Sequence, residues 1–288
     1  MKNKPYYMIA TGATLWGLMG LFVQPFYNWG FSASELVAIR ALSAFIIAVS
    51  YLVIFRRDLL KIRVGDIGLF IGTGVLSIAF FNWCYFTSIQ SLSLSVSAAL
   101  LYTGPAFVTL LSRIFFAEKL TMGKVSALVL TCIGCSLVVG FLPNMQTSAS
   151  GYYLLIGLGA GFGYALYSIF GKIASNRYHP LTIITYTFLF ASVAMVPMSS
   201  LWEKASLFTQ PVVLLTSLSI GLIPTVFAYL LYTYGLAMIE SSLASIAATI
   251  EPVVAVITGM VFLGDILTPW QGAGIILILL AVTLVQRS

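Results

Sequence analysis

The sequence predicts an all-α integral membrane protein with ten transmembrane helices. Of the 288 residues, 60% are hydrophobic, while only 14 are basic and 8 are acidic. A soluble domain needs about a quarter of its residues charged to build its surface. The apolar residues also fall into continuous segments, whereas the strands of a transmembrane barrel alternate with a period of two. Both observations favour a helical membrane bundle.

Ten apolar segments of spanning length are separated by proline, glycine, asparagine or charged residues. Because about 20 apolar residues cross a bilayer as a helix, each segment is predicted to be one span. The segments are residues 6–24, 34–55, 66–88, 94–116, 123–142, 151–171, 180–199, 211–236, 242–263 and 268–286, with short connections. The first is long enough to span and has no small-residue cleavage site, so we expect it to be retained.

The basic residues predict the orientation of the bundle, because cytoplasmic loops of membrane proteins are rich in lysine and arginine. With a cytoplasmic N-terminus, only Lys204 falls outside and Arg40 lies within a span. The inner side then receives Lys2, Lys4, Arg56, Arg57, Lys61, Arg63, Arg113, Lys119, Lys124, Lys172, Arg177 and Arg287. We therefore expect an integral plasma (inner) membrane protein with both termini cytoplasmic.

An internal repeat relates the two halves of the chain. Residues 74–138 align with residues 221–285 at a constant offset of 147, with eleven identities in 65 positions. Pro105 meets Pro252 in this alignment, and each half carries five segments. Because five is odd, the second half enters the membrane from the opposite side. We predict one membrane domain made of two inverted five-helix repeats, residues 1–146 and 147–288.

Several motifs together resemble the EamA-type branch of the drug/metabolite transporter superfamily. They are Trp16-Gly17 in the first segment, Arg40 in the second, and a carboxylate-x-Leu-Thr turn after each mid-helix proline, at Glu118 to Thr121 and Asp265 to Thr268. The resemblance implies a secondary transporter of small metabolites, often amino acids, with a cavity formed mainly by helices 1, 3, 4, 6, 8 and 9. We expect an exporter that works by alternating access.

Glu251 is the only carboxylate predicted deep within a span. At about 1.5 Å per residue from Ser242, it lies about 13 Å into a core of roughly 30 Å. A carboxylate there is costly unless it is paired, protonated or hydrated, and Pro252 beside it removes a backbone hydrogen bond. Glu251 is therefore predicted to be a coupling site or to bind a substrate cation. The alternative is a neutral structural acid that caps local backbone groups.

Arg40 is the second charge predicted within the membrane, about 9 Å from the outer edge. It is a candidate partner for Glu251 in an ion pair. Two other interpretations remain open: Arg40 extends to the outer interface, or it contacts an anionic group of the substrate.

Polar and aromatic side chains follow one face of residues 211–236, where Thr225, Tyr229 and Tyr232 are spaced i, i+4 and i+7. Aromatic rings with hydroxyl groups suit a ligand cavity, although tyrosines also lie at membrane interfaces. The repeat places Ile78, Asn82 and Tyr85 at the matching positions. The complete predicted substrate-binding set is Trp16, Asn82, Tyr85, Tyr102, Tyr164, Thr225, Tyr229, Tyr232 and Glu251.

Other functions have weaker support in the sequence. The glycines from Gly157 to Gly163 have the spacing of helix packing and not of a nucleotide loop, and no Walker A sequence occurs. An intramembrane enzyme is one alternative, but the only histidine is His179 and HExxH and GxSxG motifs are missing. A facilitative channel is another, without a ring of charges. We expect no enzyme activity, no cofactor, no metal, no nucleic acid and no obligatory protein partner, only a small-molecule substrate and membrane lipid.

Overall fold

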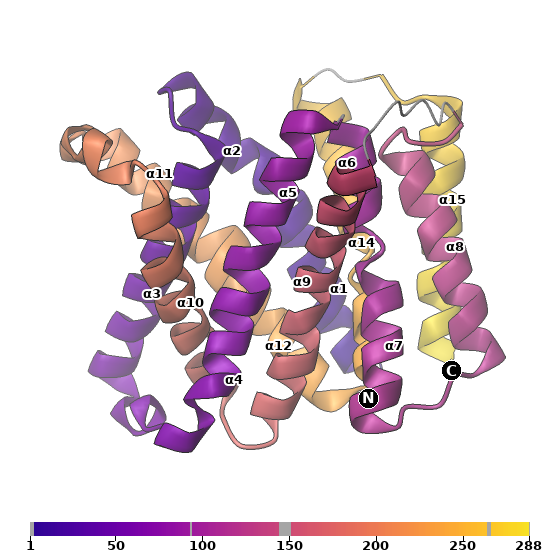
Figure 1. Cartoon of the computed structure of the whole chain (residues 1–288), viewed down its shortest axis with the longest axis horizontal. Coiled ribbons are helices and arrows are strands. Elements are labelled where there is room, and N and C mark those ends of the chain that lie inside the picture. Colours follow the sequence, from indigo (N-terminus) through magenta and orange to yellow (C-terminus); the bar gives the residue numbers. More distant parts are fainter. Residues whose placement is uncertain (1–2, 93, 144–150, 264–265, 288) are drawn as a thin grey trace.

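The computed structural model describes residues 3–92, 94–143, 151–263 and 266–287. Within these residues the chain forms an all-helical bundle without strands (Figure 1). The predicted boundary between the repeats, at residues 146 and 147, lies outside the described residues, as do Gly264 and Asp265 of the second turn motif. The division into two repeats therefore stays a prediction.

Ten helical stretches correspond to the ten predicted spans, and we number them span 1 to span 10 in chain order. Eight are long and apolar enough to cross a membrane: Lys4–Asn28, Ala33–Phe55, Val64–Ser91, Leu94–Phe116, Gly151–Ser175, Pro180–Met198, Pro211–Met238 and Ser241–Phe262. The shorter apolar helices Met122–Val138 and Pro269–Leu284 are spans 5 and 10. The predicted all-α membrane fold is confirmed, because each segment reappears with its ends shifted by a few residues.

Three spans are interrupted near their middle. Span 1 consists of α1 (Lys4–Gly17) and α2 (Met19–Asn28), and span 4 of α6 (Leu94–Leu101) and α7 (Gly104–Phe116). Span 9 consists of α13 (Ser241–Ala247), α14 (Ile250–Thr258) and, at its end, the π-helix η6 (Gly259–Leu263). Pro105 and Pro252 lie in the first turns that follow the interruptions of spans 4 and 9. Proline lacks an N–H and clashes with the preceding turn, so a helix restarts there more easily than it continues.

Two spans contain wide π-helical turns in the middle. Span 3 consists of α4 (Ile67–Ile71), the π-helix η3 (Gly72–Ala79) and α5 (Phe80–Ser91). Span 8 consists of α11 (Pro211–Gly221), the π-helix η5 (Leu222–Phe227) and α12 (Ala228–Met238). Such turns are rare and occur frequently at functional sites. At the offset of 147 the two π-helices overlap, as a repeat requires.

The remaining spans are regular helices that pair along the edges of the bundle. They are α3 (Ala33–Phe55), α8 (Met122–Val138), α9 (Gly151–Ser175), α10 (Pro180–Met198) and α15 (Pro269–Arg287). Figure 1 shows α8 beside α15 at one edge and α3 beside α10 towards the other, and these pairs make extensive contact. The connection between spans 7 and 8 covers residues 199–210, close to the predicted gap, and contains the 3₁₀-helix η4 (Leu201–Thr209).

Two of the glycines at close helix contacts show how near the backbones approach. A Cβ atom on Gly274 would lie 2.6 Å from the carbonyl oxygen of Gly134, so α8 and α15 pack backbone to backbone. A Cβ atom on Gly17 would lie 2.7 Å from the carbonyl oxygen of Glu251. The Trp16-Gly17 motif therefore brings span 1 against the restarted helix of span 9.

The two ends of the bundle differ in charge. Figure 1 shows both chain termini at the same end, which we call the terminal end, and we call the other the distal end. The described loops at the terminal end carry basic residues from Arg56 to Arg177, whereas Lys204 lies at the distal end. There its Nζ donates to Glu35 and to the carbonyl oxygen of Gly30, both at 2.6 Å. The charge segregation expected from the sequence is thus present in the folded bundle.

Candidate functional site: a central cavity

A cavity of about 120 Å³ lies in the middle of the bundle, and we call it the central cavity. It is lined by Trp16, Met19, Arg40, Phe81, Leu101, Tyr102, Tyr164, Tyr229 and Glu251. These residues come from spans 1, 2, 3, 4, 6, 8 and 9. They include the six spans expected to form the cavity, together with span 2, which contributes Arg40.

The helix interruptions place two of these side chains. Tyr102 lies between α6 and α7, and Glu251 is the second residue of α14, just after the interruption of span 9. The backbone N–H of Glu251 donates to the carbonyl oxygen of Ala248 at 3.0 Å, which closes a tight turn before the helix restarts. Both side chains therefore enter the cavity from the points where spans 4 and 9 change direction.

Arg40 is held in the cavity by the π-helical turn of span 8. Its Nε lies 3.4 Å from Thr225 Oγ1, a long hydrogen bond. The Thr225 hydroxyl in turn donates to the carbonyl oxygen of Ile220 at 2.8 Å, five residues earlier. This bond belongs to the wide turn η5, so the π-helix fixes the oxygen that Arg40 approaches.

The two charged residues share the cavity without contacting each other. No ion pair joins Arg40 to Glu251, and neither forms an ion pair with any other described residue. The direct charge pair considered from the sequence is therefore not formed. Because Arg40 lines the central cavity, it also does not extend to the membrane interface. The cavity contains one positive and one negative group, each available to a ligand.

Aromatic rings form one wall of the cavity. The ring centroids of Trp16 and Tyr229 lie 4.9 Å apart in an edge contact, and Tyr229 makes further edge contacts with Tyr167 at 5.0 Å and Phe188 at 5.1 Å. The buried Trp16 Nε1 has no hydrogen-bond partner among the described residues. A buried donor without an acceptor costs about 1–3 kcal/mol, so Trp16 is held here by its ring contacts and not by a hydrogen bond of its Nε1.

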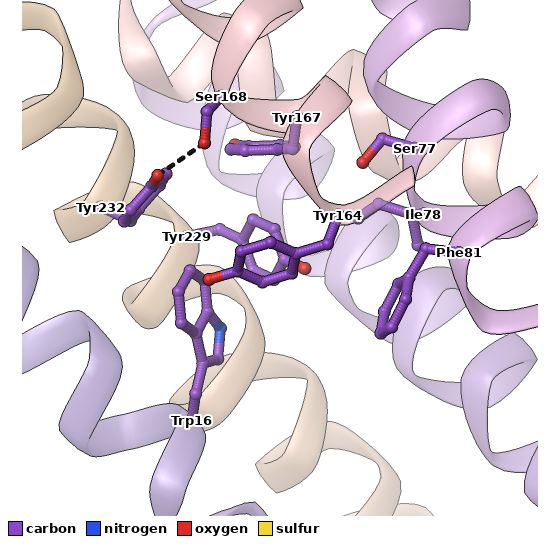
Figure 2. Close-up of a pocket in the computed structure, with 9 residues that line it drawn as sticks. All are labelled: Trp16, Ser77, Ile78, Phe81, Tyr164, Tyr167, Ser168, Tyr229 and Tyr232. Atoms are coloured by element: carbon purple, nitrogen blue, oxygen red, sulfur yellow. Dashed lines mark hydrogen bonds between the residues drawn. The ribbon is translucent and has the colours of Figure 1, made fainter. Parts of the chain in front are cut away.

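A second, smaller cavity, the annex, has a volume of about 10 Å³ (Figure 2). It shares the walls Trp16, Phe81, Tyr164 and Tyr229 with the central cavity. Its own walls are Ser77, Ile78, Tyr167, Ser168 and Tyr232. Figure 2 shows the hydrogen bond between Ser168 and Tyr232, whose oxygens are 2.7 Å apart.

The distal end contains a third cavity of about 300 Å³. Tyr102 lines both this distal cavity and the central cavity, and Tyr85, Ser95, Pro252 and Val256 also line the distal cavity. Tyr102 therefore stands between the two spaces. Towards the terminal end the bundle is instead filled by a buried apolar core, which includes Tyr6, Ile9, Ala13, Leu236, Leu243 and Ile246. The central cavity is thus approached from the distal end.

A network of charged groups lines an open pocket of about 870 Å³ at the terminal end, on the other side of the apolar core from the central cavity. Glu118, at the end of span 4, accepts from the backbone N–H groups of Ser241 at 2.7 Å and Ser242 at 3.3 Å. Lys124 lies 3.6 Å from Glu118 and pairs also with Glu240. The first turn motif thus provides a buried carboxylate that caps the start of span 9 and connects the two halves of the chain.

Most predicted site residues line a cavity. Trp16, Arg40, Tyr102, Tyr164, Tyr229 and Glu251 line the central cavity, Tyr232 the annex and Tyr85 the distal cavity. Asn82 and Thr225 line none of the three. The Asn82 amide is buried and donates to the carbonyl oxygen of Ile78 at 2.7 Å. The role of Asn82 and Thr225 in substrate binding stays a prediction.

Several lining residues were missed by sequence reasoning. Tyr167 and Ser168 follow Tyr164 at i+3 and i+4, so helical spacing was sufficient to find them. Ser77 and Phe81 flank the end of η3, and no sequence signal marks the π-helix that orients them. The described residues contain no group of three or more histidine, cysteine, aspartate or glutamate side chains placed to hold a metal ion.

The ten-span bundle with a buried, charged central cavity defines an integral membrane transporter. The profile of the EamA-like transporter family matches residues 3–140 and 151–287. The chain therefore belongs to this family.

Curated relatives have the same function class. An uncharacterized transporter of Archaeoglobus fulgidus is 25% identical over 290 residues, with 99% of each chain covered. A second from the same organism is 28% identical over 218 residues, covering 74% of this chain and 76% of that protein. The threonine/homoserine exporter RhtA of Escherichia coli K12 is 29% identical over 199 residues, covering 68% of this chain and 63% of that protein.

The fold also recurs in a solved crystal structure. Its TM-score is 0.81, with 99% of this chain and 96% of that chain covered and 14% sequence identity. At this identity the likeness shows the fold alone, which is the ten-span bundle described above.

Proposed function

We propose that the protein exports a small zwitterion, an amino acid or a related compound, by alternating access through the central cavity. In this proposal Arg40 binds the carboxylate of the substrate and Glu251 binds its ammonium group. The observation that carries the proposal is that two opposite charges line one small cavity without pairing with each other.

Electrostatics favour a ligand with both charges. A buried charge without a partner is costly, and the cost is removed by an opposite charge with good hydrogen-bond geometry. The planar guanidinium of Arg40 matches a carboxylate in a two-point contact. A ligand with only one charge leaves either Arg40 or Glu251 without a partner, whereas a zwitterion satisfies both.

The size of the cavity favours a small substrate. Its 120 Å³ is roughly ten times the 10–15 Å³ that one water molecule requires. This is below the range of about 300–1,000 Å³ typical of sites for drug-sized ligands. The relative RhtA is named as a threonine/homoserine exporter, which supports both an amino-acid substrate and the direction of transport.

The orientation follows from charge. If the basic terminal end faces the cytoplasm of the inner membrane, the distal cavity opens outward and the apolar core separates the central cavity from the pocket on the inner side. The structure then corresponds to the state that releases an exported substrate. Alternating access requires a second state in which the Glu118 network opens, and the matched interruptions of spans 4 and 9 provide points where these spans can bend.

We propose further that Glu251 couples transport to protons. A carboxylate in a cavity that opens to alternate sides can bind either a proton or the substrate ammonium group, but not both. Competition between them drives export when the outer side is more acidic.

The proposal is tested by counterflow of radiolabelled alanine in proteoliposomes. Arg40→Gln and Glu251→Gln should each weaken alanine binding by about a hundredfold, because loss of one partner of a buried charge pair costs about 2–5 kcal/mol. Arg113→Gln and Glu203→Gln remove exposed charges outside the cavity and serve as matched controls. Wild-type affinity in both cavity variants would refute the assignment of the two charges.

A further inference from the structure

We propose that the annex is the subsite for the substrate side chain, and that it selects amino acids with a short side chain, preferably one with a hydroxyl group. The inference rests on the proposed function, since it places the α-carboxylate and ammonium groups between Arg40 and Glu251. It adds a second recognition site, with its own residues, that determines which amino acid is carried.

The annex lies directly beside the central cavity. Trp16, Phe81, Tyr164 and Tyr229 form walls of both the central cavity and the annex. A ligand held in the central cavity therefore lies next to the four side chains that also line the annex. The annex contains neither Arg40 nor Glu251, so its own walls act on the side chain and leave the charged groups of the ligand to the central cavity.

The size of the annex limits the side chain. Its volume of about 10 Å³ has room for about one water-sized group, such as a hydroxyl or a methyl. Two hydrogen bonds hold the walls in place. The side-chain oxygens of Tyr167 and Thr233 lie 2.7 Å apart, and those of Ser168 and Tyr232 lie 2.7 Å apart. A longer or branched side chain has to displace Ile78 or Phe81, which form the apolar part of the wall.

The polar atoms of the annex favour a hydroxyl group. Figure 2 shows the Ser77 hydroxyl beside Ile78 on the wall opposite Trp16, and this hydroxyl can both donate and accept. The hydroxyls of Tyr167 and Tyr232 already pair with Thr233 and Ser168. A substrate hydroxyl in the annex therefore has the Ser77 hydroxyl as its available hydrogen-bond partner.

The test measures the binding of a graded set of amino acids to purified protein. Glycine, alanine, serine, leucine and phenylalanine compete against radiolabelled alanine. For the wild type we expect serine to bind at least as tightly as alanine, and leucine and phenylalanine to bind at least tenfold more weakly.

Two variants change the annex alone. Ile78→Ala enlarges it, so the affinity for leucine relative to alanine should rise about tenfold or more. Ser77→Ala removes a hydrogen-bond partner, so the affinity for serine relative to alanine should fall by up to about tenfold. Ile183→Ala and Ser217→Ala are matched controls, because both residues are buried but line none of the three cavities. Neither control should change the ratios.

The outcomes separate the two proposals. A wild type that binds alanine, but binds leucine equally well, overturns the subsite and leaves the proposed function standing. The same holds if Ile78→Ala, or the smaller change Ile78→Val where the alanine variant does not fold, leaves the leucine-to-alanine ratio unchanged. If the wild type binds no amino acid, the proposed function itself fails.

Discussion

Glu251 is the residue on which proton-driven transport should depend. Glutamine keeps the shape of the side chain and its hydrogen bonding but cannot titrate. We expect Glu251→Gln to stay folded and to lose substrate accumulation driven by a pH gradient, measured in proteoliposomes with an imposed gradient. Exchange of alanine across the membrane should persist only at about a hundredfold higher concentration, because the variant also loses the partner of the substrate ammonium group. Transport at the wild-type rate with unchanged pH dependence would make Glu251 a structural residue.

Arg40 should depend on the shape of its side chain as well as on its charge. Lysine keeps the positive charge but loses the planar fork that matches a carboxylate. We expect Arg40→Lys to weaken alanine binding by about tenfold, less than Arg40→Gln does, in the same competition assay. Equal affinities for Arg40→Lys and Arg40→Gln would show that charge at this position does not contribute.

The site was predicted best at the charged residues that lie within apolar spans. Glu251 and Arg40 stand out because a charge within an apolar span is costly. The same reasoning did not predict their arrangement, since the depth of each residue says nothing about how they face each other across the cavity. The role of Asn82 stays a prediction, and Ser77 was not predicted, because the π-helix in which it lies has no signature in the residue types.

At the scale of elements, Glu118 should stabilise the start of span 9. Its carboxylate accepts from the N–H groups of Ser241 and Ser242, and it lies beside Lys124. Glu118→Ala leaves these donors and the buried lysine with fewer partners. We expect unfolding to become easier by about 3 kcal/mol, the range found when one partner of a buried ion pair is removed.

Thermal unfolding of the purified variant in detergent measures this effect. Glu203→Ala, in the exposed 3₁₀-helix between spans 7 and 8, removes a carboxylate without such contacts and is the control. If both variants unfold at the wild-type temperature, Glu118 does not hold span 9 in place.

The boundaries of the spans were predictable because each is limited by proline, glycine or charged residues that also end the helix in the structure. In the sequence, Pro105 and Pro252 indicate the interruptions of spans 4 and 9. No residue type in the sequence indicates the interruption of span 1 at Leu18, because no proline follows it closely. The helix η4 was read as part of a short connection, since its residues have no periodicity that distinguishes them from a loop.

At the scale of the whole molecule, the segregation of basic residues predicts that the terminal end faces the cytoplasm. Single cysteines at Ser206 and Lys119, in a background without Cys84, Cys132 and Cys135, test this orientation. We expect an impermeant maleimide added to whole cells to label the cysteine at Ser206, at the distal end, and not the one at Lys119. Labelling in the reverse pattern would contradict this orientation. The distal cavity would then open to the cytoplasm.

The central claim is that the cavity between Arg40 and Glu251 recognises a zwitterion, and equilibrium binding to the purified wild-type protein tests it most directly. Alanine carries both charges, whereas propionate has only the carboxylate and ethylamine only the ammonium group. Calorimetric titration should show that alanine binds at least a hundredfold more tightly than either analogue, because each analogue leaves one buried charge without a partner. Binding of propionate or ethylamine as tight as that of alanine, or no binding of alanine, would contradict the claim.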